Sequence, residues 1–314
     1  FLINSNFKSN IKSFNDRLFD MTREVAMAKK PVDVEINLEK KPHYRLEVSS
    51  DITPYGPTVK MKKAQITENP SIPTKVEKVY SQDDLKASDA MNYLSRHEFD
   101  ERYLTKLLSA GTMGLKAGRK LVPTRWSITA VDDTLGKKHI KDIKDYTSRT
   151  NYHVFSGDYM GNYYIILLFP EIWSYELFET YMPKDDSKKK DLKTFTDYEG
   201  MNGRKEYAYN TMGGYYAARL PVLEHLKRVK RQGSALVLRF VTDDYWVPLG
   251  VWVVRQTVRT TLENKPLEFG SKELMLKYVK ILVQKKFGYD VDNLLTNSRL
   301  LKEMKSQAKL NSFF

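Results

Sequence analysis

Carboxylates, a guanidinium and an indole lie close together in the segment TRWSITAVDD, and these groups suit two kinds of chemistry. Asp132 and Asp133 are adjacent hard oxygen donors, the kind of ligand that holds Mg²⁺ in nucleases. Arg125 suits a phosphate, because a guanidinium donates in a fixed fork, and Trp126 suits stacking on a base. An ordinary structural reading stays open, in which Trp126 is core and the two aspartates cap a helix that begins near Thr134.

A second group of carboxylates lies in DYEGMNGRKEYAYN, a stretch with the composition of a loop. Asp197 or Glu199 would complete a metal site with Asp132 or Asp133 if the fold brought them together. The catalytic candidates are therefore Asp132, Asp133, Asp197 and Glu199, with Mg²⁺ as the cofactor of an enzyme. Nothing in the sequence requires a cofactor.

Two stretches suit a polyanion. Gly213 and Gly214 precede an expected helix, where backbone N–H groups without a partner bind phosphate, and Arg219 would extend that surface. The alternative is that the glycine pair only starts the helix against a close neighbour. The run HLKRVKR places four cations around the end of the same helix, where cations also suit the helix dipole: Lys227, Arg228, Lys230 and Arg231.

The chain ends in SQAKLNSFF, which leaves two phenylalanines at a terminus. One helical turn would place Leu310, Phe313 and Phe314 on one face as an apolar plug, with the amide of Gln307 beside it. The pattern resembles the PCNA-interacting peptide, or PIP box, by which repair proteins dock on the sliding clamp. That resemblance implies PCNA as a partner, and the alternative is a tail that packs on its own domain.

Composition narrows the classes of function. Lys and Arg number 52 against 39 Asp and Glu, a net charge of +13, which favours a polyanionic partner such as DNA. A basic surface that serves only solubility is the alternative. Cysteine is absent, which excludes disulfides, thiolate metal sites and cysteine proteases within these residues. None of the five histidines has the spacing of a metal site or a catalytic triad.

The sequence predicts neither a membrane span nor a signal peptide. No apolar run approaches the roughly 20 residues that cross a bilayer, and no charged-then-apolar segment opens the chain. We therefore expect a cytoplasmic protein, associated with the nucleoid. The chain begins with Phe, so we also expect residues upstream of it.

Hydrophobic periodicity and turn residues predict an α+β fold of helices and mostly antiparallel strands, as one large domain or two lobes with a short peptide tail. The expected domains are an N-terminal lobe of 1–196, a C-terminal lobe of 197–305 and a clamp-binding tail of 306–314. Helices are predicted at 10–30, 81–98, 100–111, 133–148, 213–233, 249–264, 271–288 and 290–307, with a kink or an interruption at Pro221. Strands are predicted at 31–49, 173–183 and 234–242, with a hairpin at 152–170 around Gly161 and Asn162.

Several phrases resemble the archaeal Nre family of DNA-repair proteins: KPVDVE, ITENPSIP, LLSAGTMG, RKLVPTRWSITAVDD, GGYYAARLPVLEHL and PLGVWVVRQTVR. They run in order from about residue 30 to residue 260, and the tail stands where that family carries its PIP box. The resemblance implies a clamp-associated factor in the response to DNA damage. The resemblance also implies a cysteine-rich, zinc-binding stretch near the N-terminus, but these residues contain no cysteine, so no zinc site is predicted here.

Three hypotheses follow. The first is a DNA-repair factor tethered to PCNA by its tail, with a basic body that engages DNA or a repair intermediate. The second is an enzyme, either a metal-dependent nuclease or another DNA-modifying activity, centred on Asp132 and Asp133. The third is an adaptor that binds only proteins and whose positive charge serves solubility.

Overall fold

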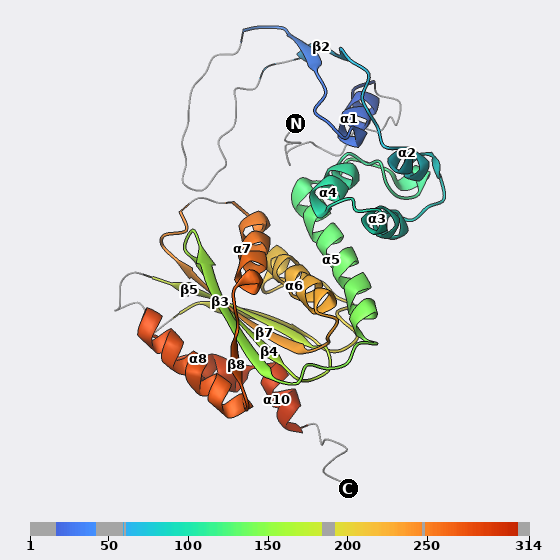
Figure 1. Cartoon of the computed structure of the whole chain (residues 1–314). Helices are drawn as coiled ribbons and strands as arrows, with labels where there is room; N and C mark the ends of the chain where they lie inside the picture. Colours follow the sequence, from blue (N-terminus) through green and yellow to red (C-terminus); the bar gives the residue numbers. More distant parts are fainter. Residues whose placement is uncertain (1–16, 42–58, 60, 184–191, 247–248, 307–314) are drawn as a thin grey trace. The chain divides into compact units, whose positions relative to one another are not determined.

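The computed structural model describes residues 17–41, 59, 61–183, 192–246 and 249–306 (Figure 1). Contacts divide the chain into two compact units, Phe1–Leu135 and Gly136–Phe314, and helix α5 (Thr124–Ile143) contributes residues to both. Helices combined with mostly antiparallel sheets confirm the predicted α+β class. The lobe boundary that we predicted between residues 196 and 197 lies inside a strand, so it differs from the boundary between the units.

The first unit contains short helices and one pair of strands. Asp100 begins α4 as its N-cap, since its carboxylate accepts a 2.7 Å hydrogen bond from the Tyr103 amide. The buried Arg119 binds the loops together by donating to three backbone carbonyls. The elements are α1 (Arg17–Met27), β1 (Val34–Leu38), β2 (Met61–Ile66), α2 (Thr74–Ser81), α3 (Ala87–Arg96), α4 (Glu101–Ser109) and the 3₁₀ turn Lys116–Gly118.

The second unit is built on a sheet of six described strands in the order β6-β5-β7-β4-β3-β8. All neighbouring strands are antiparallel except β5 and β7, which run parallel. The strands are β3 (Tyr152–Tyr159), β4 (Asn162–Phe169), β5 (Tyr175–Met182), β6 (Thr194–Glu199), β7 (Ser234–Thr242) and β8 (Leu267–Phe269). The helices are α6 (Met212–Arg228), α7 (Val251–Glu263), α8 (Lys272–Phe287), α9 (Asp292–Asn297) and α10 (Arg299–Ser306).

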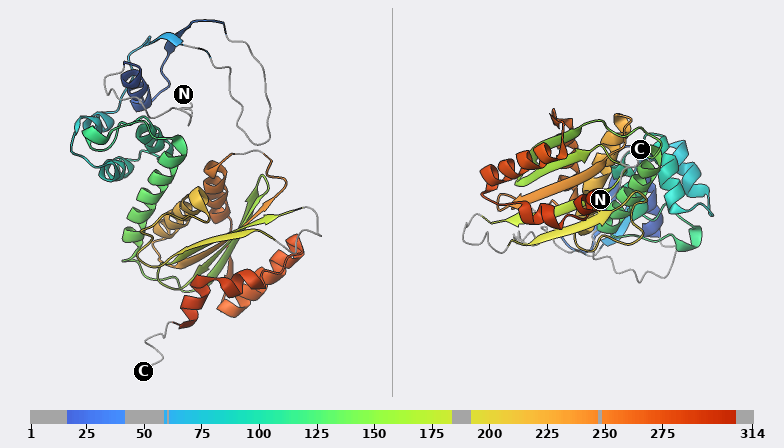
Figure 2. Two further views of the ribbon diagram at one scale, coloured as in Figure 1. Left: turned by 180° about the vertical axis from the view of Figure 1, so that it is seen from behind. Right: turned by 90° about the horizontal axis from the view of Figure 1, so that it is seen from below.

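Helices cover both faces of this sheet, which gives three layers (Figure 2). Successive residues of a strand point to opposite faces, so the continuous apolar run of β4 serves both layers. Ile166 and Leu168 pack with α6 and α7, whereas Ile165 and Leu167 pack with α8, α9 and α10. The run is apolar throughout because neither face of β4 meets water.

The hairpin at 152–170 is confirmed as β3 and β4, and its turn residues are Met160 and Gly161. Their φ angles of 48° and 73° are the left-handed values that a two-residue turn requires. Gly161 is needed for a second reason, because a Cβ there would lie 2.4 Å from the Tyr245 amide nitrogen. Helix α6 continues through Pro221 without the interruption that we predicted.

Other expectations are corrected by tertiary packing. Residues 124–143 form the single helix α5, so Asp132 and Asp133 lie in its interior and cap nothing. The helix predicted at 81–98 begins later, as α3 at Ala87, and helix α2 before it was not predicted. The segment 290–307 likewise forms two helices, α9 and α10. Strands β2, β6 and β8 were not predicted. None of the helices in the described ranges is long and apolar enough to cross a membrane.

Candidate nucleic-acid interface

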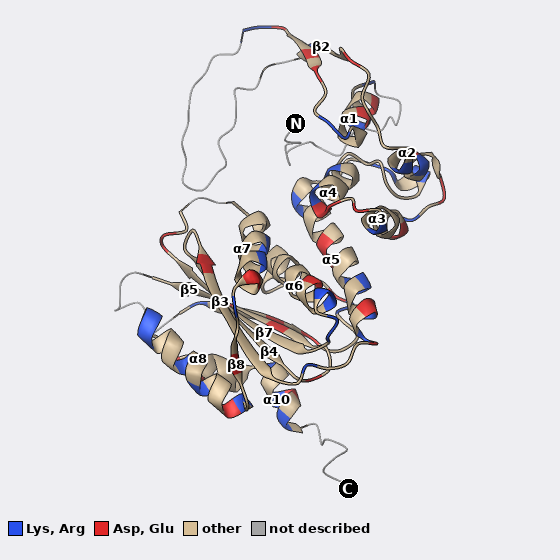
Figure 3. Ribbon diagram, in the orientation of Figure 1, with Lys and Arg blue, Asp and Glu red and all other residues tan. Residues whose placement is uncertain are grey.

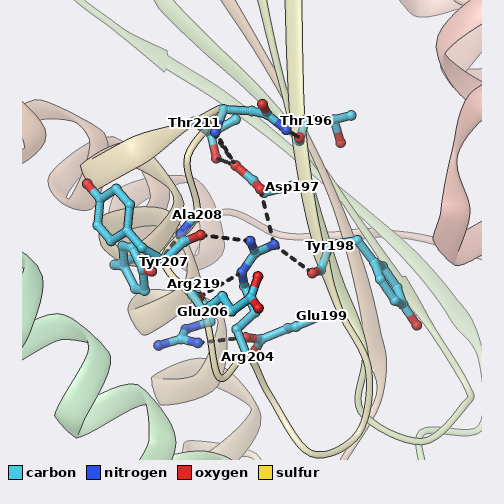
Figure 4. A network of polar contacts seen from close by, with 12 residues as sticks. Thr196, Asp197, Tyr198, Glu199, Arg204, Glu206, Tyr207, Ala208, Thr211 and Arg219 are labelled. Carbon is cyan, nitrogen blue, oxygen red and sulfur yellow. Dashed lines mark hydrogen bonds and ion pairs between the residues drawn. The ribbon is translucent and has the colours of Figure 1, made fainter.

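Asp197, one of the carboxylates singled out in the sequence, organises the loop that connects β6 to α6 (Figure 4). Its Oδ2 atom accepts from the amides of Asn210 and Thr211 at 3.0 and 2.8 Å, and from the Thr211 hydroxyl at 2.9 Å. Its Oδ1 atom lies 3.1 Å from the Arg204 guanidinium. Asp197 therefore ties the C-terminal end of the loop of residues 200–211 to Arg204 in its middle.

Arg204 holds the middle of that loop. Its guanidinium donates to the backbone carbonyls of Tyr198 and Tyr207 at 2.9 and 3.0 Å, and to that of Glu206 at 3.3 Å. It also lies 5.3 Å from the centre of the Tyr215 ring, a cation–π distance. The Arg204 side chain alone thus holds three backbone carbonyls in and beside the loop.

A second ion pair lies deeper, beneath the loop. The Arg219 guanidinium donates to Glu199 at 2.6 Å, and both side chains are fully buried. The other oxygen of Glu199 accepts from the Trp173 indole at 3.2 Å. Arg219 also lies over the rings of Tyr215 and Tyr216. Because it is fully buried, Arg219 braces the start of α6 and does not form part of a surface.

These contacts decide what the candidate carboxylates do. Asp197 and Glu199 each pair with an arginine and accept further hydrogen bonds, which is the arrangement of a structural buried charge. Asp132 is fully buried within α5. Across the described ranges, no three His, Asp or Glu side chains come together in a way that would hold a metal ion. The described residues therefore offer no donor set for the Mg²⁺ of the nuclease hypothesis.

The braced loop presents two tyrosines, Tyr207 and Tyr209, which we call the tyrosine platform. Tyr209 is 76% exposed, and the two ring centres lie 5.3 Å apart. Tyr207 stacks on Tyr216 at 5.5 Å, and the Tyr216 hydroxyl accepts from the Ala208 amide at 2.9 Å. Rigid, exposed aromatic rings beside a lysine, Lys205, form a surface on which unpaired bases stack.

The tyrosine platform was missed in the sequence. Its only signal there is a Tyr-x-Tyr pattern within a polar loop, and tyrosines are common throughout this chain. Exposure of large aromatic rings is decided by the loop's path, which Arg204 and Asp197 fix from the neighbouring strand.

The glycine pair at the start of α6 packs close to the carboxylate of Glu179. Gly213 and Gly214 lie in the first turn, and the Gly214 amide donates to the Thr211 carbonyl at 3.1 Å. A Cβ at Gly214 would lie 2.5 Å from Oε1 of Glu179, which pairs with Arg239 at 2.6 Å. Close packing on β5 thus accounts for Gly214, and Glu179 supplies negative charge close to the helix N-terminus.

The basic run at the other end of α6 is mostly on the surface (Figure 3). Lys227 donates to Asp142 at 2.6 Å. Arg228, Lys230 and Arg231 are exposed, and no carboxylate pairs with them in the described part of the chain. These three cations stay available to a polyanion.

Trp126 is 61% exposed, so it is not a core residue. The Arg125 guanidinium lies 6.0 Å from the centre of its ring, and both side chains project from the first turn of α5. The functional reading of this pair, a stacking ring beside a phosphate-binding cation, remains a prediction. The four tail residues Gln307, Leu310, Phe313 and Phe314 lie outside the described residues.

The fold is that of a two-unit α+β protein with an arginine-braced loop at one end of its larger sheet. The chain belongs to the archaeal Nre family: residues 1–185 match the family described as Archaeal Nre, N-terminal, and residues 199–313 match Archaeal Nre, C-terminal. No solved structure matches it.

Curated relatives support the same membership. The chain is 41% identical to the DNA repair protein NreA of Haloferax volcanii over 84% of its own length, and 39% identical to the DNA repair protein NreB of Archaeoglobus fulgidus over 90%. The matched region spans 65% of the first relative and 71% of the second. It also matches NreA of Archaeoglobus fulgidus, at 41% identity over 79% of this chain and 63% of that protein.

Proposed function

We propose that this chain acts in DNA repair, that PCNA recruits it to DNA through its C-terminal tail, and that its body then contacts DNA. The repair role rests on the relatives, which are named DNA repair proteins. Recruitment rests on the spacing of Gln307, Leu310, Phe313 and Phe314. A protein recruited in this way would be found at the nucleoid.

The observation that carries DNA contact is the tyrosine platform. Arg204, Asp197 and Tyr216 hold its backbone in place, so stacking a base on Tyr209 would cost little conformational entropy. The exposed cations after α6 and the net charge of +13 would attract the strand's phosphates. The rival nuclease has no comparable support, because its carboxylates Asp197 and Glu199 are paired with arginines.

Clamp recruitment is tested by calorimetry of the chain with its cognate PCNA, beside a copy that ends at Ser306. Burial of three large apolar side chains against the cost of ordering a short tail predicts a Kd of about 1 µM. Binding should disappear with the tail. Equal binding by both copies, or by neither, would mean that the tail does not recruit this protein to the clamp.

DNA contact is tested by fluorescence anisotropy with single-stranded DNA, using Tyr209→Ala and, as a matched control, Tyr159→Ala at the exposed tip of the β3–β4 hairpin. Loss of one stacking ring should weaken binding by about tenfold, whereas Tyr159→Ala should bind like the unmodified chain. Affinity should also fall steeply with salt. Affinity that salt does not change would exclude contact with the phosphate backbone and favour a protein-only adaptor.

A further inference from the structure

The loop before β3 is joined to the segment after α6 by backbone hydrogen bonds. The Arg149 amide donates to the Gln232 carbonyl at 3.0 Å, and the Gln232 amide donates to the Thr147 carbonyl at 3.1 Å. Gly233 lets the Arg149 side chain pass close by, because a Cβ there would lie 3.1 Å from its Cδ. Arg149 is thereby brought to the C-terminal end of α6, close to the cations that follow that helix.

His225, in the last turns of α6, is 8% exposed and has a defined tautomer. Its Nδ1 lies 3.3 Å from an Nη atom of Arg228, and a guanidinium only donates, so Nδ1 accepts and the proton is on Nε2. Burial, Arg149 and Arg228 lower the pKa of His225 to about 4, so the ring is neutral at pH 7. Nε2–H is therefore a hydrogen-bond donor.

Two buried donors in this cluster have no acceptor. Nε2 of His225 and Nε of Arg149 are both shielded from solvent, and neither has a hydrogen-bond partner within the described residues. Buried polar groups are normally satisfied, because an unmade hydrogen bond costs the full desolvation of the group. Two such donors in one cluster indicate a missing acceptor.

Most of the charged side chains near the two donors are cations, and Glu268 is a carboxylate close to Arg149. Arg149, Arg228, Lys230 and Arg231 form no ion pair with a carboxylate in the described part of the chain. The nearby Glu268 accepts from Asn151 and lies 3.7 Å from His153. Burial and the charge of Arg231 lower the pKa of Arg149, and the charge of Glu268 only partly offsets them.

We propose that Arg149, His225 and Arg228 form a site for the terminal phosphate of a nucleic-acid strand, here called the α6 phosphate site. The inference rests on the proposed DNA contact and names the group that is recognised. A terminal phosphate offers three oxygens that are not shared with another nucleotide, whereas a phosphate within the strand offers two. The two buried N–H donors of Arg149 and His225, with the Arg228 cation beside the His225 ring, suit the former, and arginine is the side chain best shaped for it.

The first test is NMR of the His225 ring in the full chain during titration with inorganic phosphate. An anion that accepts from Nε2–H should shift the His225 resonances and raise its pKa, because a nearby negative charge favours the protonated ring. Arg149→Gln should abolish the response, whereas Lys285→Gln, which removes an exposed charge on α8, should leave it unchanged. Resonances that do not move with phosphate would overturn the site.

The second test separates a strand end from free phosphate. Single-stranded oligonucleotides with a 5′-phosphate, a 3′-phosphate or hydroxyls at both ends are compared by anisotropy. One phosphorylated form should bind about tenfold more tightly than the hydroxyl form, and Arg149→Gln and Arg228→Gln should each remove that preference. Lys285→Gln should weaken all three oligonucleotides alike, if at all.

The outcomes separate this inference from the proposed function. If the three oligonucleotides bind equally, with a steep dependence on salt and a response to Tyr209→Ala, then DNA contact stands and the strand-end site is overturned. If the preference for phosphate survives in Arg149→Gln and Arg228→Gln while both variants unfold as the unmodified chain does, the recognition lies elsewhere and the α6 phosphate site is overturned.

Discussion

The arginines near the two ends of α6 differ in whether a carboxylate pairs with them. Towards the N-terminal end, three arginines that reach the interior pair with carboxylates: Arg204 with Asp197, Arg219 with Glu199 and Arg239 with Glu179. At the C-terminal end, Arg149, Arg228 and Arg231 have none in the described ranges. At the N-terminal end, here called the matched end, the arginine–carboxylate pairs hold the loop of residues 200–211 in place. At the C-terminal end, the unmatched end, arginines without a carboxylate partner have N–H donors that can bind a ligand.

The difference follows from the cost of burying charge. A buried charge is tolerated when a partner and further hydrogen bonds replace its lost hydration. Glu199 meets that condition with Arg219 and Trp173. Arg149 has no ion pair among the described residues and only a partial contribution from the charge of Glu268, so an added anion would stabilise it. Four predictions test this comparison, from the largest expected effect to the smallest.

Arg219→Met at the matched end should lower the free energy of unfolding by about 3–5 kcal/mol, because it leaves the Glu199 carboxylate buried without its cation. Urea unfolding followed by far-UV circular dichroism measures this. The double variant Arg219→Met with Glu199→Leu should recover most of the loss. A double variant as unstable as the single one would show that packing of Arg219 on Tyr215 and Tyr216 matters more than the ion pair.

Gly214→Ala should cost about 1–3 kcal/mol, because the new methyl group would lie 2.5 Å from Oε1 of Glu179. Gly270→Ala is the control, since a Cβ at Gly270 meets nothing within 4 Å. The same urea measurement should show little change for that control. Equal effects of the two variants would mean that Glu179 moves aside easily and that the matched end is less rigid than its contacts indicate.

Acid should destabilise the second unit through His225 and His139. Burial is the main cause that lowers the pKa of each to about 4 from an ordinary 6.5, with added repulsion from Arg149 and from Lys227 respectively. The unfolded chain therefore binds more protons between these values, and stability falls as the pH drops from 6.5 towards 4. Each histidine should contribute roughly 1–2 kcal/mol between pH 7 and pH 5.

Urea midpoints measured across that pH range test this expectation. His225→Gln should flatten the profile by about half, since His139 keeps its share. Saturating phosphate should also flatten it, because an anion at the α6 phosphate site raises the pKa of His225. An unchanged profile in His225→Gln would contradict the assignment.

Arg231→Gln at the unmatched end should raise stability by a few tenths of a kcal/mol, the opposite sign to Arg219→Met, because it removes a like charge near Arg149. Lys285→Gln, a loss of the same charge on α8, controls for the change in net charge. A clear loss of stability in Arg231→Gln alone would reveal a partner for this cation and end the contrast between the two ends of α6.

Much of the second unit follows from local pattern. The β3–β4 hairpin, β5, β7 and the helices α6, α7 and α8 have hydrophobic runs or helical spacing bounded by turn residues, and all were predicted. Strands β6 and β8 were missed because each lies at an edge of the sheet and has few buried residues. The parallel pairing of β5 with β7 could not be predicted either, since Tyr175 pairs with Ala235, 60 positions further along the chain.

The features of the candidate site also fall into those that the sequence predicts and those that only the structure reveals. The sequence by itself determined the α+β class, the excess of positive charge, the basic run after α6 and the clamp-like tail, because composition and residue spacing carry those properties directly. Only the tertiary structure shows that Asp197 and Glu199 form ion pairs with arginines. It also shows that Trp126 and Tyr209 are exposed to solvent and that Arg149 lies near His225. Burial and partnership depend on which distant segments pack together, and no local pattern records that.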